Sequence, residues 1–190
     1  MREGSHRQTV SNQNLLGAAR ISLLAYAVMP EENTSARELL RHSLATVAYR
    51  AGKIIRDAPQ GYVDFDAGQK VRTPLQILAH ISDLFDWGLS MAKGKPAWHD
   101  APPASWPDEV QRFFDSLKSF DDYLAGPEPL HTSPQKLFQG PLADALTHVG
   151  QLAMLRRMSG IPIRGENYYK ADIAKGRVGK EQSAAKLEFD

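Results

Sequence analysis

The chain has 190 residues, a length that usually closes one hydrophobic core, so two full domains are not expected. Apolar residues make up 42% of the sequence and charged residues 24%, which predicts a globular fold and excludes wholesale disorder. With 23 basic and 22 acidic side chains the net charge is +1, too balanced for a nucleic-acid-binding surface. The chain has no cysteine, which excludes disulfides, cysteine-ligated metals and a cysteine nucleophile.

Residues 1–33 are expected to form an N-terminal extension. The part of the chain most similar to a secretory signal is Leu15 to Met29. Arg20 interrupts this segment, and its apolar part is at the short limit for such signals. No stretch approaches the roughly 18–20 apolar residues of a membrane helix. We therefore expect a cytoplasmic protein without a membrane partner, in which this segment is an extension or a short helix docked on the body.

Helical periodicity dominates the remaining sequence. Asn33, Thr34 and Ser35 offer capping groups with Glu38 in a capping-box position, and Thr73 precedes a proline suited to a first helical turn. A short helical piece is expected to open at Ser133-Pro134. Four long helices are predicted, from Ser35 to Asp57, Pro74 to Lys93, Trp106 to Leu124 and Pro141 to Met158.

Four long helices joined by loops predict an all-α fold, specifically a four-helix bundle over residues 34–170. Residues 171–190 are rich in glycine, lysine and glutamate and are expected to form a C-terminal tail that ends loosely. The polar and aromatic run from Arg164 to Tyr169 has two interpretations. It folds over one mouth of the bundle, or its tyrosines anchor the tail.

Few polar side chains fall on the apolar helix faces, where bundles bury their ligand sites. His80 lies within the apolar arc of the second helix, while Asp144 and His148 are one turn apart on the fourth. Two imidazoles and a carboxylate suit zinc, nickel or non-haem iron. From spacing alone, a solvated acid–histidine pair and a packed core histidine are commoner than a metal ligand set, and all three interpretations stay open. The remaining histidines are interpreted as exposed: His6, His42, His99 and His131.

Two segments carry a resemblance to a known family. The run from Arg72 to Trp87, RTPLQILAHISDLFDW, resembles the second helix of DinB-like, or YfiT-like, metal-binding four-helix bundles, in which a histidine is the first ligand. The stretch from Asp144 to Leu152, DALTHVGQL, is similar to the fourth-helix signature of that family. Matched by position, His80 and His148 correspond to two histidine ligands. Asp144 stands where a third histidine is usual, and related mycothiol-dependent maleylpyruvate isomerases have a glutamate there.

The resemblance covers about residues 34–170 and implies several properties. It implies an up-down-down-up bundle with a long crossover, a divalent metal ion held by His80, Asp144 and His148, and a homodimer. It also implies a metal-dependent enzyme that acts on a small-molecule substrate, as a thiol-dependent S-transferase or isomerase using a low-molecular-weight thiol. The alternative is a non-catalytic, stress-associated or dimerisation bundle, in which His80 is a packed histidine and Asp144 a surface acid.

Overall fold

The computed structural model describes Met1 and residues 31–189, and side chains from Thr34 onward. The chain divides after Thr34 into two units, and the description below concerns the second, Ser35–Asp190. The segment Leu15 to Met29, most of the expected N-terminal extension and His6 lie outside the described residues.

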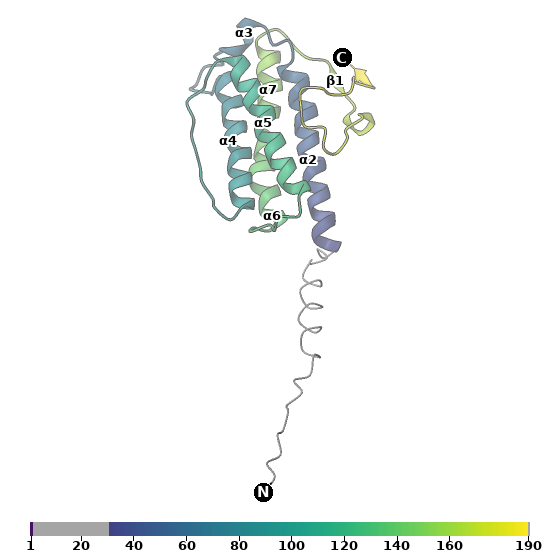
Figure 1. The fold of residues 1–190 in the computed structure, drawn as a ribbon. Helices are drawn as coiled ribbons and strands as arrows, with labels where there is room; N and C mark the ends of the chain where they lie inside the picture. The colour runs from purple at the N-terminus through teal and green to yellow at the C-terminus, as the bar shows by residue number, and fades with distance from the viewer. Residues whose placement is uncertain (2–30, 190) are drawn as a thin grey trace. The chain divides into compact units, whose positions relative to one another are not determined.

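The described chain is all-α apart from one short pair of strands (Figure 1). Among the described residues, none of the helices has the length and apolar character needed to cross a membrane. In chain order the elements are α2 (Glu31–Ile55), α3 (Gln60–Val63), α4 (Pro74–Ala92), α5 (Trp106–Ala125), α6 (Pro134–Leu137), η1 (Phe138–Leu142), α7 (Ala143–Met158), β1 (Gly165–Glu166), η2 (Tyr168–Lys170) and β2 (Glu188–Phe189).

Helices α4 and α5 run in the same direction, although they are consecutive in the chain. Near their beginnings, Arg112 of α5 donates a hydrogen bond to the carbonyl of Ala79 in α4, and near their ends Tyr123 donates to the carbonyl of Ala92. The chain therefore returns along the whole length of α4 through residues 93–105 before α5 begins (Figure 1). We call this segment the crossover.

Helix α7 runs against α4, since Gly88 of α4 lies beside Pro141 just before α7, whereas His80 lies beside His148. The four long helices enclose one apolar core. Its largest fully buried side chains come from α2, α3, α4, α5 and α6: Leu44, Ile54, Tyr62, Ile77, Leu78, Ile81, Phe85, Phe113, Leu117, Phe120, Leu124 and Leu137. Helix α7 adds the buried Leu152 and Leu155. This core fixes which face each helix turns inward.

Three of the predicted helix starts are confirmed by their capping hydrogen bonds, among them that of the short helix α6, where Ser133 accepts from the backbone N–H of Lys136. Thr73 and Gln76 form a reciprocal capping box at the start of α4, and Ser105 accepts from the backbone N–H of Asp108 at the start of α5. The predicted start of the first helix after Ser35 is wrong, because α2 already begins at Glu31 and passes through the expected cap. Residues that can cap are also tolerated inside a helix when their side chains face solvent.

The fourth long helix also differs from the prediction. Pro141 does not begin a helix but lies inside η1, a π-helical turn that joins α6 to α7 without a break. A proline removes one N–H and crowds the preceding turn, and a wider turn relieves that crowding. Gly88 on α4 allows close packing here, since a Cβ at that position would lie 3.1 Å from the Pro141 ring and 2.8 Å from Phe120.

The C-terminal segment packs against α2 instead of ending loosely. Val178 is buried in the core, and β2 pairs antiparallel with β1. The buried carboxylate of Glu166 accepts a hydrogen bond of 2.6 Å from Tyr49 and pairs with Lys53 at 3.0 Å, both from α2. The run from Arg164 to Tyr169 therefore anchors this segment to α2.

Candidate metal site

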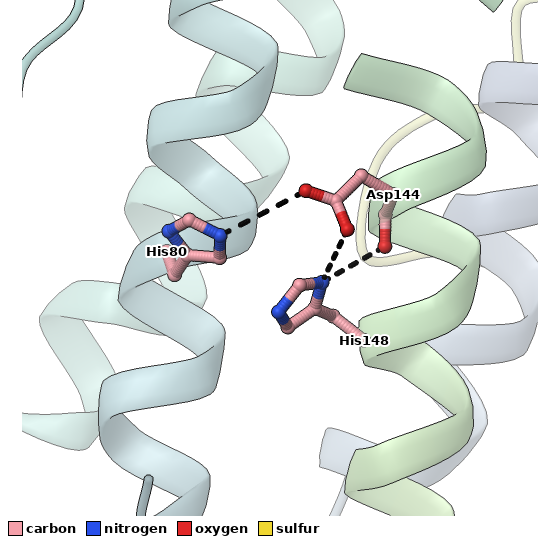
Figure 2. Close-up of side chains that lie close together, drawn as sticks. All are labelled: His80, Asp144 and His148. Carbon is pink, nitrogen blue, oxygen red and sulfur yellow. Dashed lines mark hydrogen bonds and ion pairs between the residues drawn. The ribbon is translucent and has the colours of Figure 1, made fainter. Parts of the chain in front are cut away.

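Two antiparallel helices position three side chains that could hold a metal ion. His80 lies one turn from Leu84 and beside Ile81, whose burial turns this face of α4 inward. Asp144 and His148 are one turn apart on α7, so both side chains project toward α4 (Figure 2). The triad is thus assembled by core packing between α4 and α7.

The donor atoms of the triad, one from each side chain, all lie within 4.8 Å of one another. Nε2 of His80 is 4.0 Å from one carboxylate oxygen of Asp144. The other oxygen is 3.1 Å from Nδ1 of His148, a contact that orients the ring but does not involve its Nε2. The two imidazole rings lie 4.7 Å apart between centroids. Zinc bonds of about 2.1 Å in a tetrahedral arrangement separate donor atoms by roughly 3.4 Å, so donor atoms within 4.8 Å of one another would have to draw closer to share one ion.

The tautomer of His148 follows from its hydrogen bond. Its Nδ1 lies 2.9 Å from the backbone carbonyl oxygen of Asp144 and donates to it, because a carbonyl can only accept. The proton on Nδ1 leaves the lone pair of Nε2 free, and Figure 2 shows that nitrogen on the side of the ring turned toward α4. An N–H held by a carbonyl is the usual arrangement of a metal-binding histidine.

His80 is less completely satisfied. Its Nδ1 is buried and has no hydrogen-bond partner within the described part of the chain, while its Nε2 points toward Asp144 (Figure 2). Burial lowers the pKa of His80, and the positive charge of Arg72 and the neighbouring His148 lower it further. The imidazole is therefore neutral at neutral pH, the form that can coordinate a metal ion.

The crossover covers His80 with an aromatic side chain. Trp98 packs edge-on against the His80 ring at 5.6 Å between centroids, and against Trp87 of α4 at 5.9 Å. Trp98 is itself half exposed. The indole therefore limits the movement of the imidazole and shields it from water on one side.

A buried ion-pair network fastens the crossover to the helices. Arg112 pairs with Asp83 at 2.7 Å and with Glu109 at 2.9 Å, and both carboxylates are only 2% exposed. Their remaining oxygens accept backbone N–H groups of the crossover, from Ala101 and Ala104. Arg112 thus holds together α4, α5 and the loop that carries Trp98.

A cavity of about 450 Å³ opens beside His80. His80 forms part of its wall, which comes from the loop before α4, the first turns of α4 and the crossover. Its lining residues are Lys70, Arg72, Gln76, Ala79, His80, Asp83, Asp100, Ala101, Pro102 and Pro103. A cavity of this size suits a small molecule.

The donor chemistry of the triad fits a divalent cation. Imidazole nitrogen and carboxylate oxygen are ligands of zinc, nickel and non-haem iron, and three protein donors leave positions open for a further ligand. The described residues therefore contain a group, His80, Asp144 and His148, that could hold a metal ion.

Sequence reasoning identified the residues of the triad but missed their surroundings. Trp98, Arg72 and Arg112 come from loops or from another helix, and periodicity carries no signal for such contacts. The only available hint was a tryptophan within a proline-rich loop. His42, His99 and His131 are exposed, as interpreted from the sequence, and do not join the triad.

Comparison of the chain with protein-family models, with curated proteins and with solved structures gives no match in any of the three.

Proposed function

We propose that this protein is a divalent-metal-dependent enzyme of the DinB-like type, in which His80, Asp144 and His148 hold one ion. One observation carries the proposal: three donors from two antiparallel helices converge within 4.8 Å. The tautomer of His148 supports it, because a lone pair is left free on Nε2. The metals that suit this donor set are zinc, nickel and iron.

The path of the chain also supports the family assignment. The DinB-like resemblance implies an up-down-down-up bundle with a long crossover, and α4 and α5 run parallel with residues 93–105 between them. The residues matched to family ligands by position are the same residues that converge in space.

The reaction class that we propose is transfer of a thiol to an electrophile, or a thiol-assisted isomerisation. The chemistry that a bound divalent ion supplies is a lowered pKa for a water or thiol at its open position, which gives a nucleophile near neutral pH. The chain has no cysteine, so the thiol must be a separate low-molecular-weight molecule. His80 and His148 contribute neutral nitrogens, Asp144 contributes negative charge, and Trp98 keeps water from one side of His80.

Asp144 provides the sharpest test, because the family more often has a histidine there. In Asp144→Ala one of three donors is lost, so metal affinity should fall at least tenfold, whereas Asp144→His should retain it. Calorimetric titration of zinc, nickel, iron and manganese into chelator-stripped, untagged protein measures this. His42→Ala is the matched control, since that imidazole is exposed and is not part of the triad. Equal affinity in wild type and in both Asp144 variants would remove Asp144 from the site.

The alternative function is a non-catalytic dimerisation bundle, and one observation favours it. Leu39 on α2 and Phe138 in η1 are exposed at 63% and 46% and line an apolar groove of about 340 Å³ with α6. The predicted homodimer would bury such side chains. Light scattering that gives a single-chain mass of 21.1 kDa across micromolar concentrations would rule out the dimer, and a chain that binds no metal but dimerises would favour this alternative.

A further inference from the structure

The cavity beside His80 has a positively charged mouth that no ion pair within the described residues neutralises. Lys70 and Arg72 both line it and are both exposed, and neither forms a salt bridge or a side-chain hydrogen bond in the described part of the chain. Arg72 lies close enough to His80 for its charge to act on the imidazole. An arginine without a partner at the edge of a cavity is suited to a carboxylate or phosphate.

The acidic residues in the same wall do not cancel this charge. Asp83 is 2% exposed and already engaged by Arg112 at 2.7 Å and by the N–H of Ala101. Asp100 is the only other acid in the lining, and it lies on the crossover. Two unpaired cations against one unpaired carboxylate leave the lining positive, so the cavity favours an anion.

The direction of α4 adds to the positive character of the cavity. Gln76 lines the cavity from the first turn of the helix, directly after the Thr73 cap and the two basic residues. The first turn of a helix carries the positive end of the helix dipole, which favours negative charge nearby. The side-chain cations and the helix terminus therefore act in the same direction.

We propose that this cavity binds a small organic anion, whose carboxylate or phosphate is held by Arg72 and Lys70 while the rest of the molecule reaches the wall formed by His80. The cavity volume of about 450 Å³ admits a molecule that spans both ends. The assignment deepens the proposed function, since the anion would be the substrate or cosubstrate that approaches the metal-site triad. The role of the anion as substrate or cosubstrate rests on the proposed function, whereas the binding of the anion to the cavity does not.

Succinate, its neutral analogue succinamide and inorganic phosphate are the probes, titrated calorimetrically into chelator-stripped and zinc-loaded protein. Succinate should bind both forms, at least tenfold more tightly than succinamide, and Arg72→Gln should weaken it at least fivefold in both. Lys70→Gln should weaken it less, because lysine is a more strongly hydrated point charge. Arg157→Gln is the control, since Arg157 is an exposed arginine at the end of α7, outside the cavity lining.

These titrations distinguish a carboxylate ligand from a phosphorylated one, and they test the anion site separately from the proposed metal-dependent function. If phosphate binds as tightly as succinate, the ligand is assigned as phosphorylated. If phosphate binds more weakly than succinate, the ligand is assigned as a carboxylate. Succinate binding only with zinc, unaffected by Arg72→Gln, would overturn the anion site and leave the metal site intact. Arg72-dependent binding of succinate to a protein that binds no metal would reject the proposed function and keep the anion site. Failure of both succinate and phosphate to bind would overturn the inference.

Discussion

Two polar clusters lie at different places on the helices, and they are built in opposite ways. The anchor cluster joins Tyr49 and Lys53 of α2 to Glu166 and Glu188 of the C-terminal segment, through contacts of 2.6–3.0 Å in which each charge meets its opposite. In the triad of His80, Asp144 and His148, Nε2 of His80 lies 4.0 Å from the Asp144 carboxylate, and the buried Nδ1 of His80 has no partner in the described chain. One cluster is complete by itself, and the other is not.

The difference separates stabilisation from binding. A buried polar group without its partner costs free energy, so a cluster that only stabilises a fold is expected to satisfy all of its members. Burial and Glu166 raise the pKa of Tyr49, so its hydroxyl remains a donor throughout the physiological range. The triad instead keeps donor atoms close together without satisfying them, which is typical of sites that bind something else.

The largest expected effect concerns a third cluster, next to the triad but built like the anchor cluster. Arg112→Ala leaves the buried carboxylates of Asp83 and Glu109 without their cation and should cost about 3 kcal/mol of unfolding free energy. Urea denaturation measures the loss. Arg112→Lys keeps the positive charge but not the simultaneous contacts with both carboxylates and the crossover. Its stability should therefore lie between those of the wild type and Arg112→Ala. A loss below about 1 kcal/mol would show that full pairing here does not mean stabilisation.

Metal should add stability to the incomplete cluster. An ion that binds only the folded chain raises the unfolding free energy by about 2.7 kcal/mol at a hundredfold excess over Kd. Both histidines must be neutral to coordinate, so the gain should fade below about pH 6. Thermal unfolding with and without zinc, from pH 8 to pH 5, checks both statements. A gain that is unchanged across this range would contradict the histidine ligands.

Glu166→Gln tests the complete cluster directly. The change removes the charge that Lys53 faces and weakens the acceptor for Tyr49, so stability should fall by about 2 kcal/mol while zinc affinity is unchanged. Urea denaturation and calorimetry measure the two quantities, with Asp115→Asn on the exposed face of α5 as the control. If zinc affinity fell with stability, the two clusters would not be independent.

The smallest expected effect is on the pH dependence of the metal-free protein. The pKa of His80 is lowered in the folded chain by burial and by Arg72, so the unfolded chain binds the proton more readily. Stability should therefore decrease as pH falls below about 6.5, the unfolded value. His80→Asn should flatten this part of the profile, measured by urea denaturation from pH 8 to pH 5. An unchanged slope would mean that the burial of His80 has no energetic consequence.

Local signals in the sequence predicted much of the fold. Thr73 before Pro74 gives the start of α4, Ser133 before Pro134 gives the start of α6, and the helical spacing of Asp144 and His148 places both on one side of α7. Each of these depends on residues within one turn. The all-α class follows from the same periodicity.

Contacts between distant segments were beyond sequence reasoning. Trp98 reaches His80 from the crossover, which carboxylates of two different helices fasten at Ala101 and Ala104. Glu166 is buried because α2 supplies a hydroxyl and an ammonium, which no pattern near Glu166 reveals. The true start of α2 was missed for the opposite reason, since good capping residues occur there inside a helix.

The π-helical turn η1 has a consequence for the evolution of chain length. A π turn closes its hydrogen bonds one residue later than an α turn, so it holds one extra residue while the helices on both sides keep their angular positions. Leu137 before it and Ala145 after it both face the core. Deletion of Pro141 would remove that extra residue and convert the turn to ordinary α-helix. Asp144 and His148 would remain turned toward α4. Homologous chains one residue shorter at this point are therefore expected to keep the same site.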